Sequence, residues 1–199
     1  MKLGVVVLLS VFSSVVFAAG DSGGYVTLQG GSPSGFDTGT STLDSSTSLG
    51  LRLGFRANQY FAIEAGYTSL LSKTKATYSV STQSQLKASG ITQSSTVTSD
   101  GTEVAGIFSF PLSEALSPFV RLGIANMSQK TETVSSFASN NSTTTNKYSG
   151  LTYGVGIQYA LDKSIAVQLG YDGYNLKASD STVANQKPSN AYLGATYYF

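Results

Sequence analysis

Seven residues that carry charge or strong hydrogen-bonding groups fall on one face of segments whose pattern indicates β-strands. They are Arg52, Glu64, Glu103, Arg121, Gln158, Gln168 and Asp172. Paired carboxylates could act as general acid and base, but arginines on the same face favour ionised, inert forms of Glu64 and Glu103. Because charges enclosed in a protein need partners, we interpret this set as a lumen polar network. Structural pairing is favoured over a role in conduction, and we expect no catalytic residues.

The residue types that are missing narrow the chemistry further. The sequence of 199 residues contains no His and no Cys, so it has no disulfide framework, no thiolate or imidazole metal site, and no nucleophile activated by a histidine base. The aspartates outside the strand segments show no spacing typical of a calcium loop. The net charge of +1 is too small for a nucleic-acid partner. We expect no cofactor and no metal.

The first residues resemble a secretion signal. Lys2 gives a positive start, residues 3–17 form an apolar run, and Val16-Phe17-Ala18 has the small-x-small pattern of a cleavage site. The run is shorter than the roughly 20 residues that a transmembrane helix needs. We predict a signal peptide over residues 1–18, with cleavage after Ala18 or alternatively after Ala19, and a single domain over residues 19–199.

The rest of the chain alternates apolar and small or polar residues with a period of two, which indicates strands with two different faces. In the clearest segment, Leu49, Leu51, Leu53 and Phe55 alternate with polar residues and glycines. The pattern predicts eight strands, near 24–30, 48–55, 61–68, 102–110, 120–125, 153–159, 165–172 and 190–199.

The predicted connections alternate strictly between short and long. Short turns fall near 56–59, 111–118 and 161–163, whereas long loops rich in Ser, Thr, Asn and Gln fall near 31–47, 72–97, 129–147 and 176–189. In an antiparallel arrangement, all the long loops emerge at one end and the short turns and both termini at the other. Short turns on one side and long loops on the other are typical of outer-membrane barrels.

Alternation alone fits either a soluble β-sandwich with an apolar interior or a membrane barrel with an apolar exterior. Only 12% of residues are charged, about half the share in soluble domains, and aromatic residues gather near the short turns, as in an interfacial girdle. We therefore predict an all-β fold, an eight-stranded antiparallel up-and-down transmembrane β-barrel. The predicted girdle comprises Phe55, Tyr60, Phe61, Phe108, Phe110, Phe119, Tyr159, Tyr197 and Phe199.

Several segments resemble the family of OmpA-like eight-stranded outer-membrane barrels. They are the runs from Leu53 to Tyr67, Pro118 to Gly123, Gly154 to Leu161 and Ala191 to Phe199. The resemblance implies a location in the cell outer membrane of a Gram-negative cell, with long loops outside and the termini in the periplasm. It also implies that Phe199 is part of the signal that the barrel assembly machinery recognises. The chain is similar to short, barrel-only members.

The resemblance also suggests a charged gate, of which Glu64 and Arg121 look like members. Gln158 and Gln168, however, stand where the family pattern often has charge. The favoured function is a structural or surface-interaction barrel with Ser/Thr-rich external loops, serving adhesion or envelope integrity through a host or cell-surface ligand. The alternatives are a narrow passive pore for small solutes or ions, and a secreted soluble β protein.

Outer-membrane lipids and lipopolysaccharide are the other expected partners. Lysines decorate the predicted long loops and could attract anionic lipopolysaccharide head groups. Their scattered spacing along the sequence, however, favours a role in solubility. They are Lys73, Lys75, Lys87, Lys130, Lys147, Lys177 and Lys187.

Overall fold

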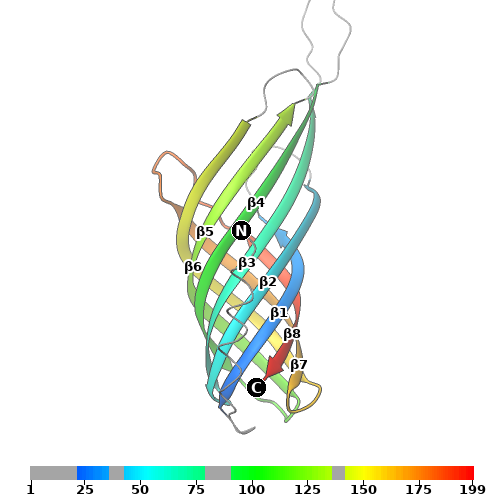
Figure 1. The fold of residues 1–199 in the computed structure, drawn as a ribbon, viewed down its shortest axis with the longest axis vertical. Coiled ribbons are helices and arrows are strands. Elements are labelled where there is room, and N and C mark those ends of the chain that lie inside the picture. Colours follow the sequence, from blue (N-terminus) through cyan, green and yellow to red (C-terminus); the bar gives the residue numbers. More distant parts are fainter. Residues whose placement is uncertain (1–21, 36–42, 79–90, 136–141) are drawn as a thin grey trace, which may run out of the picture.

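The computed structural model describes residues 22–35, 43–78, 91–135 and 142–199, which form a closed barrel of eight strands (Figure 1). Every strand pairs antiparallel with its neighbours in sequence, and β1 pairs with β8 to close the barrel. This confirms the predicted fold. The strands are β1 Gly23–Ser34, β2 Leu43–Asn58, β3 Phe61–Tyr78, β4 Ile91–Ser109, β5 Leu116–Ser135, β6 Ser142–Ala160, β7 Ile165–Ala178 and β8 Ser189–Tyr198.

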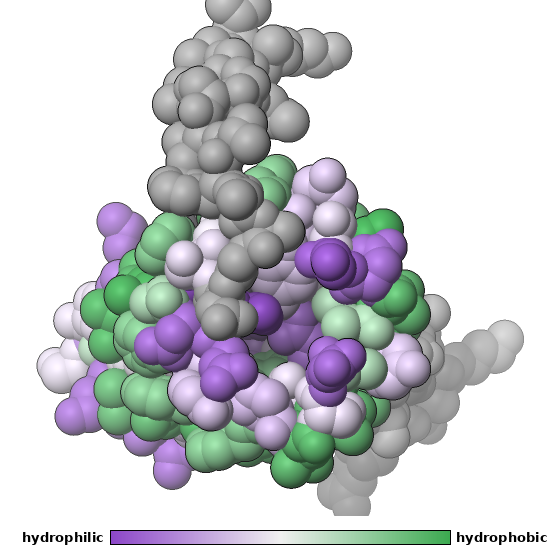
Figure 2. Space-filling view, turned by 90° about the horizontal axis from the view of Figure 1, so that it is seen from below, coloured by the Kyte–Doolittle hydropathy of each residue, from purple (hydrophilic) through white to green (hydrophobic). Residues whose placement is uncertain are grey.

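The apolar face of the strands is the outside of the barrel. Leu51 is 47% exposed, whereas the next residue, Arg52, is 1% exposed. Figure 2, seen from the short-turn end, shows apolar side chains around the rim and hydrophilic ones towards the lumen. Exposed apolar side chains on all eight strands form an outward band, which suits a lipid environment. Its members include Leu28, Leu49, Leu51, Ile63, Tyr67, Val104, Leu122, Ile124, Leu151, Val155, Leu169, Tyr171 and Leu193.

Most of the predicted aromatic girdle faces outward near the short turns. Its exposed members are Phe55, Tyr60, Phe108, Phe110, Tyr159, Tyr197 and Phe199. Phe61 is half-buried, with its ring centroid 5.2 Å from that of Phe108. The prediction was wrong for Phe119, which is 6% exposed and packs inside the barrel. Phe119 has the same parity along β5 as the buried Arg121, so the pleat directs both side chains into the lumen.

The strands extend well into the ranges predicted as long loops, 31–47, 72–97, 129–147 and 176–189. β3 continues to Tyr78, β4 begins at Ile91, and β5 runs to Ser135. The intervening residues are therefore fewer: 35–42, 79–90, 136–141 and 179–188. Threonine has a branched β-carbon that suits strands, and a strand beyond the bilayer needs no apolar outer face. The alternation that marks a strand in the sequence fades there, although backbone pairing continues.

The predicted signal peptide, residues 1–18, and Ala19 lie outside the residues that the structure describes. No helix in the described part of the chain is long and apolar enough to cross a membrane.

Side chains fix two of the short turns. The Asn58 Oδ1 accepts hydrogen bonds from the backbone N–H groups of Tyr60 and Phe61. Asp162 plays the same part before β7.

Candidate functional site

Five charged residues meet in the middle of the lumen, one from each of five strands. They are Arg52 on β2, Glu64 on β3, Glu103 on β4, Arg121 on β5 and Asp172 on β7. All five are buried, with exposed fractions of 5% or less. We call this set the charge cluster. Three carboxylates thus surround two guanidinium groups in a space closed to bulk solvent.

Arg52 joins two of the carboxylates. Its Nε lies 2.9 Å from Oε1 of Glu103, and its Nη2 donates a hydrogen bond to Oδ2 of Asp172. The guanidinium also lies over the ring of Tyr192, with Cζ 5.1 Å from the ring centroid. A rigid, forked donor can hold two acceptors and a ring face at once, so Arg52 is held from several sides.

Arg121 contacts all three carboxylates. Its Nη2 lies 2.9 Å from Oε1 of Glu103, and its Nε lies 3.4 Å from Oε2 of Glu64. Its Nη1 is 3.2 Å from Oε2 of Glu103 and 3.8 Å from Oδ2 of Asp172. Glu103 is therefore shared by both arginines, which makes the cluster one connected network.

Two glycines make room for these contacts. Gly66 on β3 stands opposite both Arg52 on β2 and Glu103 on β4. Gly154 on β6 stands between Arg121 on β5 and Asp172 on β7 in the same way. A Cβ atom on Gly154 would lie 2.2 Å from Oδ1 of Asp172. The side chains on the flanking strands therefore reach each other across a strand that carries no side chain at that level.

Neutral hydrogen-bonding groups complete the cluster. The hydroxyl of Tyr25 donates to Oε1 of Glu64 at 2.9 Å. The hydroxyls of Thr68 and Tyr174 lie 3.3 and 3.5 Å from carboxylate oxygens of Glu103. Tyr25 thus engages Oε1 of Glu64, whereas Arg121 contacts Oε2, and Thr68 and Tyr174 add donors to Glu103 oxygens that the arginines already contact. Buried carboxylates require such partners.

Gln158 and Gln168 lie nearer the short-turn end and do not join the ion pairs. They stand opposite each other on β6 and β7, and both line a cavity of about 20 Å³ that also touches Glu64 and Arg121. A cavity of this size holds one water molecule. The amide of Gln158 donates to the hydroxyl of Tyr198 near the mouth at the short-turn end.

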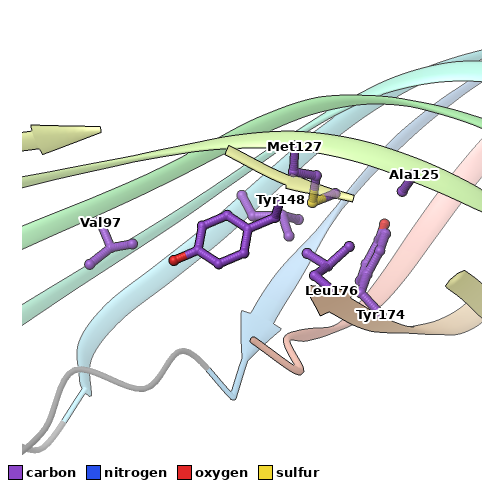
Figure 3. Packing of buried hydrophobic residues seen from close by; sticks show 7 residues of the cluster. Val97, Ala125, Met127, Tyr148, Tyr174 and Leu176 are labelled. Atoms are coloured by element: carbon purple, nitrogen blue, oxygen red, sulfur yellow. The ribbon is translucent and has the colours of Figure 1, made fainter. Parts of the chain in front are cut away.

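A cluster of buried apolar side chains fills the lumen beyond the charge cluster, towards the outer end (Figure 3). We call it the apolar plug. Its members come from β3 to β7 and are Leu70, Val97, Ala125, Met127, Tyr148, Tyr174 and Leu176, none more than 4% exposed. Most outward side chains at this level are polar, as at Asn126 and Asn175. The apolar face thus changes from the outside to the inside of the barrel beyond the apolar band.

A smaller apolar layer lies on the other side of the charge cluster. It consists of Tyr25, Ala62, Ile107 and Phe119. Ile107 shares the inward face of β4 with Glu103, and its exposed fraction is 8%. Nearer the short turns, a vestibule of about 350 Å³ opens at that mouth of the barrel, lined by Arg56, Gln158 and Tyr198 among others.

Of the seven residues predicted for the lumen, the structure brings five together and places the two glutamines next to them. The apolar plug was missed. A sequence signal for it exists, because Leu70 has the same strand parity as Glu64, and Met127 the same as Arg121. Phe199, the predicted assembly signal, packs its ring 5.5 Å from that of Tyr197 on the outer face.

The arrangement favours ion pairing over reaction chemistry. Each carboxylate of the charge cluster lies within ion-pair distance of an arginine, so its oxygens are engaged in pairing. Among the described residues, no group of three or more His, Cys, Asp or Glu side chains is placed to hold a metal ion. The chemistry available here is the stabilisation of a filled lumen.

Comparisons with known proteins agree with this architecture. Residues 4–199 match the model of a family described as the outer membrane protein beta-barrel domain. Outer membrane protein A of Serratia marcescens is 25% identical over 154 residues, which cover 75% of this chain and 38% of that protein. The chain therefore spans well under half the length of this relative.

Two solved structures from Pseudomonas aeruginosa have the same fold. The outer membrane protein OprG matches with a TM-score of 0.52 and 14% identity, covering 92% of this chain and 99% of that chain. The N-terminal β-barrel domain of OprF matches with a TM-score of 0.51 and 14% identity, covering 90% and 98%. At such identities the likeness shows the fold alone.

Proposed function

This chain belongs to the family of outer membrane protein β-barrel domains and lies in the outer membrane, and we propose that it is a structural and surface-interaction barrel with a closed lumen. The observation that supports this proposal is the layered filling of the lumen. The charge cluster lies between the apolar plug and the smaller apolar layer. Water and ions are excluded from narrow apolar constrictions by dewetting.

The outer parts of the strands support a role at the surface. β4, β5 and β6 continue past the apolar band as paired strands whose outward side chains are largely Thr, Ser, Asn and Lys. Pairs such as Thr131 with Thr144 keep this part ordered. A stiff, polar surface presented above the bilayer costs less ordering entropy on binding than a flexible loop. We propose that it contacts a host or neighbouring-cell ligand.

Two measurements test the proposal. Planar-bilayer recordings of the purified protein should show no reproducible conductance. A protease applied to intact cells should cleave between Tyr78 and Ile91 and spare the turn between β4 and β5, which would face the periplasm. Cleavage of that turn instead would mean that the barrel is inserted with the opposite orientation.

The alternative is a narrow passive pore, and the vestibule at the periplasmic mouth favours it. This polar-lined space leads towards Glu64 and Arg121. A pore would give steady single-channel currents in the same bilayer recordings, and these currents would change in Glu64→Gln or Arg121→Ala. A silent bilayer for all three proteins rejects the pore.

We also propose that residues 1–18 are removed as a signal peptide and that Phe199 serves assembly. Amino-terminal sequencing of the protein from outer membranes should begin at Ala19, or at Gly20 if cleavage follows Ala19. Deletion of Phe199 should lower the amount inserted in cells, while the purified variant still refolds in detergent. Equal insertion with and without Phe199 would contradict recognition by the assembly machinery.

Lipopolysaccharide is the remaining proposed partner, since the outward surface beyond the apolar band carries lysines. Anionic head groups attract such side chains. We propose no catalytic function, because the lumen carboxylates are engaged by arginines.

A further inference from the structure

Four exposed lysines lie on one side of the barrel beyond the apolar band. Lys130 is on β5, Lys147 on β6, Lys177 on β7, and Lys187 just before β8. We call them the lysine row. They are 10 to 30 residues apart in the sequence, which is why they look scattered there, and three of them belong to strands rather than to loops.

The strand register places the four lysines in steps. Lys130 stands opposite Thr145, so Lys147 lies two residues closer to the membrane on the next strand. Ser149 stands opposite Lys177, which is again two residues lower. The pairs Gly173–Ser189 and Leu176–Gln186 follow one register. That register puts Lys187 opposite Asn175, a further step of two residues.

This stepping keeps the lysine row level with the membrane surface. Strands of a barrel are tilted by roughly 35–45°, so a level line must shift along the strands as it passes from one to the next. The upper edge of the apolar band, at Ile124, Leu151, Tyr171 and Ala191, shifts in the same direction overall. Ile124 stands opposite Leu151 and Tyr171 opposite Ala191, and Tyr171 lies four residues below Asn175, the partner of Leu151. Each lysine lies four or six residues beyond the edge residue of its own strand. With a rise of about 3.3 Å per residue and this tilt, the lysine backbones lie roughly 9–16 Å above the apolar edge.

The opposite side of the barrel lacks such a row among the side chains that the structure describes. Beyond the apolar band, none of the described outward side chains on β1 to β4 is cationic, and most are polar or acidic, as at Ser32, Thr47, Ser69, Thr98 and Asp100. The distribution of positive charge is therefore one-sided within the described surface.

Nearby carboxylates only partly neutralise the row. Glu132 lies 2.5 Å from the ammonium group of Lys130. Asp180 accepts hydrogen bonds from the backbone and hydroxyl of Thr182, which lower the pKa of this carboxyl below its usual range. Among the described residues, no carboxylate is within ion-pair distance of Lys147, Lys177 or Lys187.

We propose that the lysine row binds the phosphate groups of phosphorylated glycolipids in the outer leaflet. This assignment rests on the proposed lipopolysaccharide contact and names the site for it. A lipid fits better than a soluble anion because the row lies above the apolar band and follows the direction of its edge. One ligand can then place acyl chains against Leu151 and Tyr171 and phosphates against the ammonium groups above. Lysine stems can also bend towards the head-group layer.

The test is titration of the detergent-purified, folded barrel with diphosphorylated lipid A, followed by native mass spectrometry. We expect binding that weakens roughly fivefold for each lysine removed, as for lysines at an anionic lipid surface. The variant Lys147→Gln/Lys177→Gln tests the row. The variant Lys163→Gln removes an exposed lysine at the periplasmic turn and should bind as the wild type does. Dephosphorylated lipid A should bind weakly to all three proteins.

Three outcomes would overturn the assignment. One is equal binding of lipid A by the wild type and by Lys147→Gln/Lys177→Gln. Another is full recovery of binding when Ser32→Lys/Thr47→Lys is added to that variant. Binding would then depend on the net charge of the barrel and not on the position of the lysine row. The third is displacement of lipid A by millimolar inorganic phosphate, which would indicate a site for the free anion. Migration of unboiled samples in gels reports separately whether the barrel is inserted and folded. A failure of the barrel proposal can therefore be distinguished from a failure of the lysine row to bind lipid A.

Discussion

Arg121 is the residue on which the lumen depends most, because it contacts Glu64, Glu103 and Asp172. We expect Arg121→Ala to lower the free energy of unfolding by about 3–5 kcal/mol, since removal of one partner leaves buried charges uncompensated. Urea unfolding of the barrel in lipid vesicles measures this loss. The exposed pair Lys130–Glu132 is the control, and Glu132→Gln should change the value by less than about 1 kcal/mol. Similar losses in both variants would contradict the stabilising role of the cluster.

Gly154 tests the same cluster through its geometry. A Cβ there would lie 2.2 Å from Oδ1 of Asp172, so Gly154→Ala must displace this carboxylate from the arginines. We expect a loss of about 1–3 kcal/mol in the same unfolding measurement, as for other overpacked interiors. Gly106→Ala is the matched control, because its Cβ would meet the rings of Phe61 at 3.4 Å and Phe108 at 3.7 Å. If the control is as unstable as Gly154→Ala, the loss comes from the backbone and not from Asp172.

At this scale, strand parity alone was enough to direct the charged side chains inward. Parity could not determine which arginine meets which carboxylate. Arg52 and Glu103 are 51 residues apart, and they meet only because both stand opposite Gly66 on the strand between them. Register depends on the pairing of whole strands, so these contacts required the structure.

Among the elements, the turn between β6 and β7 depends on one side chain. The carboxylate of Asp162 accepts hydrogen bonds from the backbone N–H groups of Ser164 and Ile165, both at 2.7 Å. We expect Asp162→Ala to lower the free energy of unfolding by about 1 kcal/mol, and Asp162→Asn to retain most of it because the amide oxygen still accepts. Urea unfolding in vesicles compares the two. Equal losses would show that the charge, and not the acceptor, stabilises the turn.

For the strands, the alternation of apolar and polar residues in the sequence is informative only over part of their length. Alternation identified every strand within the bilayer, because lipid on one side and the lumen on the other demand opposite side chains. Beyond the bilayer, water faces the outside and the apolar plug the inside, so residues such as Leu70 and Met127 are apolar on the face that carries charge below. When the apolar residues of one strand move from the outer face to the inner face, the sequence pattern breaks at that point. The break then resembles the end of the strand, although the strand continues.

For the molecule as a whole, the order of the strands and the orientation of the turns follow from the alternation of short and long connections, and the closed barrel agrees. Closure of the lumen does not follow from these features. It depends on how Tyr148, Tyr174 and Leu176 pack across the outer end, and packing of residues from different strands is a property of the assembled barrel. The low share of charged residues in the sequence therefore predicts that the barrel lies in a membrane. Whether solutes pass through the barrel depends on the packing of its interior.

The layered lumen makes a prediction about conduction that belongs to the entire barrel. The apolar plug and the charge cluster lie in series, so wetting one layer leaves the other as the barrier. We expect Met127→Ser/Leu176→Ser alone, and Glu64→Gln alone, to remain silent in planar bilayers. The combined variant should give small currents, because water and ions then meet neither a complete apolar plug nor an intact ion-pair network, and the smaller apolar layer is the barrier that remains.

The gel migration of unboiled samples must first show that each variant is folded, since an unfolded chain also disturbs a bilayer. Lys163→Gln, at the periplasmic turn, controls for altered surface charge and should be silent. Steady current through Met127→Ser/Leu176→Ser alone would mean that the charge cluster is no barrier to ions and that the plug is the only gate. Current through the wild-type protein would reject the closed lumen itself, because both layers are complete there and ions would have to pass between side chains that the structure packs together.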